Sequence, residues 1–288
     1  MLAALAIAAV ALCAEVVCES ARTEGPDEAS GLSSVGRDTY LCVNDKGGWL
    51  CEATIKIGDG DVSFKTNRLV RLAGRMDLEG CAFDPLTKNV WVSDEKDSSV
   101  RAFDPSTGRE VASLAIPEVY RKNMRRCRSF ESLAISPDGL RLYTSNEESL
   151  SCDPTNVVRI QEFVRKGAGD SFRPSRQFAY EVDPPGGRAF GKRTFSGVSE
   201  LLVMPDDSLL VLEREFSVKI LPSFRIRIYR IVLGEKGKTL VWEEPSTFAN
   251  YEAMCLGPRL PDGRRSLVLV SDGGSGALEN VLVLALTP

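Results

Sequence analysis

The sequence contains no histidine among its 288 residues. Ser-His-Asp and Cys-His catalytic groups, HExxH zinc sites and imidazole general bases are therefore excluded. The CxxC spacing of structural zinc sites is also missing, as are GxSxG, Walker, GxGxxG and EF-hand motifs. Any chemistry of this chain must rest on carboxylates, arginines, hydroxyls or a hard metal ion.

The chain has no large excess of either charge, with 36 Lys and Arg against 40 Asp and Glu. Nucleic-acid binding, which needs a broad basic surface, is not expected. The 43% of apolar residues is enough to build a substantial core. We expect a monomer that acts on a small molecule, without a stable membrane span.

The only long apolar run lies at the N-terminus, from Leu2 to Cys13. It is short for a bilayer span and is typical of the apolar region of a secretory signal. We therefore predict a signal peptide over residues 1–18 and a secreted or otherwise extracytoplasmic protein; a ragged N-terminus without a targeting role is the alternative. Residues 19–38, rich in Ser, Gly, Glu and Asp, predict a flexible linker into a domain over residues 39–288.

Six of the eight cysteines lie after this leader. Cys42 and Cys51 flank a Gly-Gly turn and are candidates for a disulfide across a hairpin, and Cys127 and Cys152 are a second candidate pair. The two remaining cysteines, Cys81 and Cys255, lie inside apolar strands, which predicts buried free thiols.

Short runs of Val, Ile, Leu, Tyr and Phe alternate with Pro-Asp-Gly, Asp-Pro and Gly-Gly turns, which indicates an all-β protein. Four segments repeat one order: a glutamate, a strand, a proline-led turn, a second strand and a polar end. Two of the intervals between the glutamates are 52 residues and one is 69; the glutamates are Glu79, Glu131, Glu200 and Glu252. A period near 50 residues predicts a β-propeller of five or six four-stranded blades. The longer interval predicts an inserted loop over 166–193.

Equivalent residues on the inner strands of a propeller form a ring around its axis. The four glutamates are expected in such a ring, and the ends of the second strands add Asp94, Glu95, Asn146, Glu147, Glu213 and Asp272. Carboxylates this close must gain protons, pair with cations or bind a metal. An all-oxygen set favours calcium, with magnesium or manganese second. The predicted metal ligands are Glu79, Glu131, Glu200, Glu252, Asp94, Asn146 and Asp272.

Arginines provide an alternative to a metal. Arg214 could reach into the channel and neutralise two carboxylates through its forked donors. A basic segment before Glu131 includes Arg126 and Arg128, which with Arg214 are the candidates for binding an anionic substrate; a solvated loop is the alternative for that segment.

These motifs resemble one known family. The segments around Asp77-Leu78-Glu79-Gly80, Phe130-Glu131-Ser132, Gly197-Val198-Ser199-Glu200 and Asn250-Tyr251-Glu252, each with its second strand, are similar to the phytase-like family, described as having esterase-like activity of phytase. The resemblance runs from about residue 68 to the C-terminus. It implies an exported propeller whose repeated Glu and Asp residues carry a hydrolytic site.

Three functions follow as hypotheses. The first is a metal-dependent hydrolase of phosphate or carboxylic esters, with Glu131 or Glu200 as the general base. The second is a lactonase similar to the gluconolactonase propellers, favoured by Asn146. The third is a non-catalytic binding scaffold whose axial metal or Glu–Arg pairs only stabilise the ring.

Overall fold

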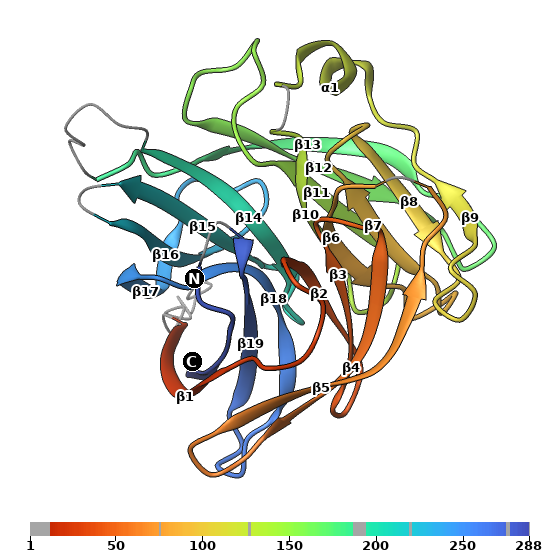
Figure 1. The fold of residues 1–288 in the computed structure, drawn as a ribbon. Helices are drawn as coiled ribbons and strands as arrows, with labels where there is room; N and C mark the ends of the chain where they lie inside the picture. The colour runs from red at the N-terminus through yellow and green to blue at the C-terminus, as the bar shows by residue number, and fades with distance from the viewer. Residues whose placement is uncertain are drawn as a thin grey trace, which may run out of the picture.

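The computed structural model describes residues 12–74, 76–125, 128–186, 194–218, 221–274 and 277–287. Within these ranges the chain folds into five four-stranded antiparallel sheets arranged as the blades of a propeller (Figure 1). The predicted all-β propeller is confirmed, and of the two predicted blade numbers five is correct.

Each blade follows the chain from its inner strand outward, except at the last. Blade 1 consists of β2 (Ala29–Gly36), β3 (Thr39–Asn44), β4 (Trp49–Ile57) and β5 (Val62–Arg71). Blade 2 consists of β6 (Leu78–Phe83), β7 (Val90–Asp94), β8 (Ser99–Phe103) and β9 (Glu110–Ser113). Blade 3 follows a short helix, α1 (Glu118–Asn123), and consists of β10 (Phe130–Ile135), β11 (Arg141–Asn146), β12 (Val157–Val164) and β13 (Arg173–Glu181).

Blade 4 consists of β14 (Phe195–Val203), β15 (Leu209–Val218), β16 (Pro222–Ile231) and β17 (Thr239–Thr247). Blade 5 combines the two ends of the chain: β18 (Asn250–Arg259), β19 (Arg265–Asp272) and β20 (Asn280–Thr287), with β1 (Cys13–Ala21) as its outer strand. The antiparallel pairing of β1 with β20 closes the ring.

Strands occupy two segments for which the sequence indicated loops. Residues 19–38 contain the end of β1 and all of β2, and residues 166–193 contain β13. The predicted flexible linker and inserted loop are therefore wrong over these strands. Their Ser, Gly and Arg content misled the prediction because β13 is an exposed outer strand, and β2 has small residues where it contacts its neighbours.

The inner strands β2, β6, β10, β14 and β18 contact one another in a closed circle around the axis (Figure 1). Their backbones approach closely. A Cβ atom on Gly80 of β6 would lie 2.5 Å from the Leu133 nitrogen of β10, so only glycine fits there.

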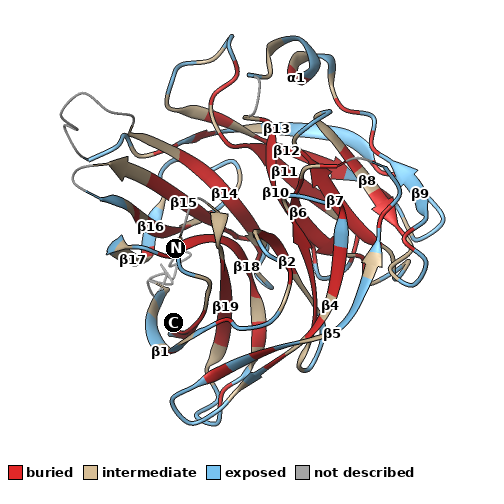
Figure 2. Cartoon of the chain, in the orientation of Figure 1, coloured by how far each residue is buried: buried red, intermediate tan, exposed pale blue. Residues whose placement is uncertain are grey.

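The apolar core forms five layers, one between each pair of neighbouring blades. Because successive side chains of a strand face opposite sides, each blade contributes to the layers on both of its faces. Figure 2 shows the inner strands largely buried and the outer strands β9 and β13 largely exposed.

Most of the described cysteines lie within this core. Cys81 and Cys255 are buried free thiols, as predicted. Cys42 and Cys51 lie directly opposite each other on β3 and β4, but both are free thiols and no disulfide joins them. Their sulfurs donate to different acceptors, the Val43 carbonyl and the Thr66 hydroxyl. Cys152 is an exposed free thiol, and its predicted partner Cys127 lies outside the described residues.

Candidate axial carboxylate site

A β-bulge in each inner strand defines the first ring of the site. The register between first and second strands shifts there in all five blades. The residues at these bulges are Ser30, Glu79, Glu131, Ser199 and Glu252. Three of the four predicted glutamates are therefore equivalent, and Glu200 is one position further along its strand, where Ser199 takes the ring position.

A second ring comes from the second strand of each blade, one position after the residue that pairs just before the bulge. Asn44, Asp94, Asn146, Glu213 and Ser271 pair with the residue before each bulge. The residues directly after them form the ring: Asp45, Glu95, Glu147, Arg214 and Asp272. Asp272 was predicted as a metal ligand, and Glu95 and Glu147 were expected near the ring. The signal for Asp45 is its place after Val43-Asn44, which matches Glu95 after Ser93-Asp94.

Asp94 and Asn146, both predicted as metal ligands, are used by their own turns instead. Asp94 Oδ1 accepts hydrogen bonds from the Asp77 and Lys96 nitrogens, both at 3.1 Å, and its other oxygen pairs with Arg101. The Asn146 amide donates to the Glu148 carbonyl and accepts from the Arg159 nitrogen at 3.3 Å. Neighbouring residues of a strand point to opposite sides. Glu95, which follows Asp94, and Glu147, which follows Asn146, therefore reach the ring in place of these two residues.

Five carboxylates gather on the side of blades 1 to 3. Glu79, Glu95 and Glu131 each offer an oxygen within 4.8 Å of the others, and Glu79 forms a second such group with Asp45 and Asp77. We call these five residues the axial acid cluster. Asp77 directly precedes Leu78-Glu79 in the sequence and was not among the predicted metal ligands.

Burial and mutual repulsion disfavour ionisation of four residues of the axial acid cluster, which are Asp45, Glu79, Glu95 and Glu131. Burial, followed by the charge of Glu131, holds the pKa of Glu79 well above its usual range. Burial and Glu147 do the same for the pKa of Glu131, and burial raises the pKa of Glu95. Burial together with a hydrogen bond to Asp77 raises the pKa of Asp45 to about 8. A bound cation would favour the ionised form of all of them.

Arginines neutralise the other side of the two rings. Arg214 Nη2 donates to Glu147 at 2.6 Å, and its Nη1 donates to Glu252 and to Asn250. Arg128 Nη1 contacts the second oxygen of Glu147 at 2.5 Å. The predicted neutralisation of two carboxylates by Arg214 is thus confirmed. Arg126, the third predicted substrate-binding arginine, lies outside the described residues.

Glu200 lies apart from the axial acid cluster. One of its oxygens accepts hydrogen bonds from the Leu133 and Leu201 nitrogens, and the other is buried without a partner. Burial raises the pKa of Glu200 well above its usual range, and its charge acts on the thiols of Cys81 and Cys255. Glu200 is therefore a buried carboxyl group of the protein interior, outside the axial acid cluster.

A pocket of about 600 Å³ opens beside the arginine side of the rings. We call it the aromatic pocket. Its polar residues belong to the axial site or border it, and its wall is largely phenylalanine; the lining residues are Arg128, Phe195, Arg214, Phe216, Leu221, Pro222, Phe224, Phe248, Asn250, Glu252, Asp272, Gly274 and Ala277.

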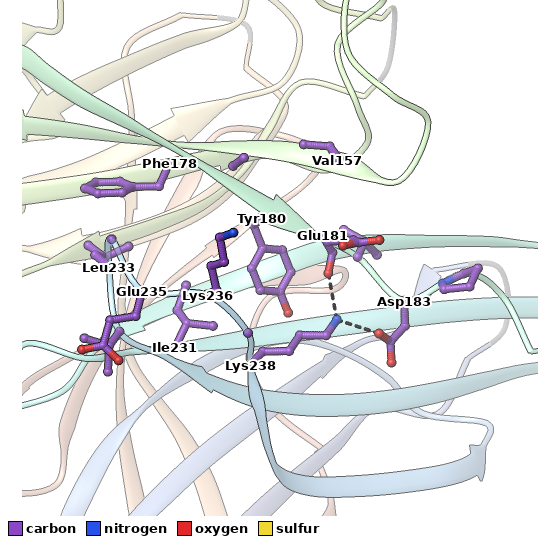
Figure 3. A pocket seen from close by; sticks show the side chains of 16 residues that line it. Val157, Phe178, Tyr180, Glu181, Asp183, Ile231, Leu233, Glu235, Lys236 and Lys238 are labelled. Carbon is purple, nitrogen blue, oxygen red and sulfur yellow. Dashed lines mark hydrogen bonds and ion pairs between the residues drawn. The ribbon is translucent and has the colours of Figure 1, made fainter.

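A second pocket, of about 500 Å³, lies between blades 3 and 4 (Figure 3). Lys238 extends beside Tyr180, donates to the Glu181 carbonyl at 2.9 Å and pairs with Asp183 at 2.8 Å. Glu213, expected near the rings, pairs with Lys238 and accepts from the Tyr180 hydroxyl at 2.5 Å. The ammonium group of Lys238 is thus neutralised by neighbouring side chains, which indicates a structural network between the two blades.

The residues of the axial acid cluster fit a hard cation. All five donors are carboxylates, the ligands that calcium prefers, and no cationic side chain pairs with Glu79 or Glu131 among the ion pairs of the described residues. Asp272 is less available as a ligand for a cation, because its oxygens accept hydrogen bonds from the Gly274 nitrogen and the Asn250 amide.

Comparison with known proteins agrees with the architecture. The family model "Phytase-like: Esterase-like activity of phytase" matches residues 27–273, so the match begins earlier than the residue 68 expected from the motifs. Myxococcus xanthus glutaminyl cyclase has a similar fold, with a TM-score of 0.50 and 11% identity over 96% of this chain and 98% of the cyclase.

Two further solved structures are similar at lower scores. One is the PQQ-bound aldose sugar dehydrogenase of Streptomyces coelicolor, with a TM-score of 0.46 and 12% identity over 96% of this chain and 98% of the dehydrogenase. The other is streptogramin B lyase, with a TM-score of 0.45 and 9% identity over 96% of this chain and 98% of the lyase. No curated protein matches the sequence significantly. At 11% identity the cyclase shows a shared fold and nothing about activity. The family match covers most of the chain, including both rings, and the chain therefore belongs to the phytase-like family.

Proposed function

We propose that this protein is an exported hydrolase of phosphate or carboxylic esters that works with a divalent cation, best calcium, held by the axial acid cluster. The observation that carries the proposal is the mutual approach of Glu79, Glu95 and Glu131 within 4.8 Å, with no arginine paired to Glu79 in the part of the chain that the structure describes. Family membership supports the ester chemistry.

The residues divide the work by position. Glu79, Glu95 and Glu131 would hold the cation, which when bound polarises an ester oxygen and acidifies a water molecule. Glu131 lies at the border between the axial acid cluster and the Arg214 side, since its pKa responds to Glu147 and Arg214 as well as to Glu95. One of its oxygens would bind the cation, and we assign the other the role of accepting a proton from water. Arg128 pairs with Glu147 through Nη1 and with Glu148 through Nε, and its side chain is 35% exposed. We therefore assign its Nη2 as the donor to a substrate oxygen.

Glu200 is left out of this assignment, although the sequence suggested it as a base. Its bound oxygen is already occupied by two backbone donors, and no cationic or acidic side chain raises or lowers its pKa.

The experiment is elemental mass spectrometry of the purified full chain, combined with its melting temperature with and without a chelator and with a panel of ester substrates. About one tightly bound calcium per chain, a lower melting temperature after chelation and calcium-dependent turnover would support the proposal. A chain with no metal and no chelator effect would contradict it. Asp206→Asn, at an exposed ion pair far from the rings, is the matched control for Glu79→Gln.

A scaffold without catalysis is the second candidate, favoured by the pairs of Arg214 with Glu147 and Glu252. It predicts that Glu131→Gln changes only stability, and that no ester in the panel is hydrolysed. The lactonase hypothesis depended on Asn146, whose amide is committed to its own turn, so no observation of this structure favours it.

Export is part of the proposal and depends on the apolar run of residues 2–13. The structure places Cys13 to Cys18 in β1, so cleavage after residue 18 would remove most of the strand that pairs with β20. The N-terminal sequence of protein recovered from the extracytoplasmic fraction would show where processing occurs. Recovery of the intact chain in the cytoplasm only would contradict export.

No helix of the described residues has the length and apolar character needed to cross a membrane.

A further inference from the structure

The aromatic pocket has the composition of a site for an apolar group. Phe195, Phe216 and Phe224 form a continuous wall, with ring centroids 5.6 Å apart for the first pair and 5.4 Å for the second. Aromatic walls of this kind accept a further ring at similar spacing. The volume of about 600 Å³ lies within the range of small-molecule sites.

Two large apolar side chains line the same pocket and face water. Phe248 is 52% exposed and Leu221 is 61% exposed. Apolar area left in contact with water costs free energy in proportion to that area. A ligand that covers both side chains recovers part of this free energy, so the pocket favours an apolar group over a solvated polar one.

The pocket is continuous with the axial site. Arg214, Glu252 and Asp272 belong to the two rings and also line the pocket. The Arg128 guanidinium lies over the Phe195 ring, 4.7 Å from its centroid, while it contacts Glu147. A molecule with its ring against Phe195 would therefore have its polar end beside the ring carboxylates.

The charges of this region disfavour a polyanion. Its two guanidiniums, Arg128 and Arg214, are already paired with carboxylates; these are Glu147, Glu148 and Glu252. With Asp272 added, acids outnumber the cations. An inositol hexakisphosphate would meet net negative charge, and like charges placed together cost free energy.

We propose that the substrate is a low-charge ester with an aromatic or bulky apolar group, which occupies the aromatic pocket while the ester bond reaches the axial acid cluster. This inference rests on the proposed hydrolase function and names its substrate class. Carboxylic esters and monophosphate esters share the required chemistry, and the test separates them.

The test compares kcat/KM for 1-naphthyl acetate and 1-naphthyl phosphate with that for methyl acetate, methyl phosphate and inositol hexakisphosphate, using the full chain with calcium. Phe248→Ser and Leu221→Ser are the pocket variants, and both positions are exposed enough to leave folding intact. Leu240→Ser is the control, because Leu240 is 45% exposed on β17 and does not line the pocket.

We expect a naphthyl ester to be the best substrate, and Phe248→Ser to lower its kcat/KM about tenfold, since apolar contacts of this size are worth a factor of 10 or more. Methyl esters should be unaffected, as should the Leu240 variant with every substrate. Whichever of 1-naphthyl acetate and 1-naphthyl phosphate is hydrolysed faster shows whether the protein cleaves a carboxylic ester bond or a phosphate ester bond. Equal rates for naphthyl and methyl esters, or preference for inositol hexakisphosphate, would overturn the substrate class while leaving the hydrolase function standing.

Equilibrium binding of 1-naphthol, followed by its fluorescence, needs no turnover. Binding that Phe248→Ser weakens, in a protein that hydrolyses no ester, would support the pocket's ligand class and overturn the hydrolase function. Absence of naphthol binding would overturn the assignment of the pocket.

Discussion

Arg214 Nη2 lies 2.6 Å from Glu147 Oε1, although the two residues are 67 positions apart and belong to different blades. The pair is almost completely buried, with the Arg214 side chain 9% exposed and that of Glu147 fully covered. It marks the border between the neutralised side of the rings and the axial acid cluster.

Arg214→Met should lower the free energy of unfolding by about 3–5 kcal/mol, because it leaves Glu147 and Glu252 buried with fewer partners. Urea denaturation at neutral pH measures this loss. Arg230→Met, at an exposed pair with Asp206, should cost at most about 1 kcal/mol. Equal effects of the two substitutions would contradict the assigned role of Arg214.

Glu131→Gln and Glu200→Gln should differ in their response to calcium. Both glutamates are buried on inner strands, but only Glu131 belongs to the axial acid cluster. We expect Glu131→Gln to abolish the rise of melting temperature on adding calcium, and Glu200→Gln to retain it. Isothermal titration with calcium gives the same comparison directly; loss of binding in both variants would place Glu200 among the ligands.

In the presence of chelator, stability should fall as the pH rises from about 5 to 9. The pKa values of Glu79, Glu131 and Asp45 are raised in the folded chain, and that of Asp45 is about 8. The folded state thus binds protons that the unfolded chain, with carboxyl pKa values near about 4, has released. Their contribution is complete at low pH and is lost as the pH passes through the folded values.

Calcium should flatten this dependence by taking the place of the protons. Melting temperatures measured in a pH series with and without calcium test the expectation. A chelated protein whose stability rises over this pH range would show that these carboxyls are ionised and paired.

The thiols should react in an order that follows their burial. Cys152 is exposed, whereas burial raises the pKa of Cys42 to about 12 and that of Cys81 well above its usual range. Because the thiolate is the reactive form, brief alkylation of the native protein followed by peptide mapping should label Cys152 and spare the other two. After unfolding, Cys42 and Cys51 should both be labelled; a pair that resists labelling until reduction would show the disulfide suggested by the sequence.

Gly197→Ala should disturb the Glu147 backbone and destabilise the protein by about 1–3 kcal/mol. Its new Cβ would lie 2.8 Å from the Glu147 Cγ and 2.9 Å from its carbonyl oxygen. Gly169→Ala, where the Cβ meets nothing within 4 Å, is the matched control and should be nearly neutral. Thermal melts of the two variants measure this difference, and equal melting temperatures would contradict the close contact of Gly197 with Glu147.

The sequence alone determined the propeller and much of the axial site. Alternating apolar residues and proline-led turns are local signals, and their period near 50 residues identified the units. The order glutamate, strand, turn and strand placed Glu79, Glu131 and Glu252 correctly, because each lies at the same point of its own blade. Arg214 was also recognised as a neutralising group.

Only the tertiary structure decided which residues share a ring. One bulge residue moves a side chain to the opposite face of a strand, which puts Ser199 in place of Glu200 and Glu95 in place of Asp94. The five blades, the closure by β1, and the meeting of Asp45 with Asp77 depend on contacts between segments far apart in the chain. Such contacts are set by packing around the axis, which leaves no local pattern in the residues that make them.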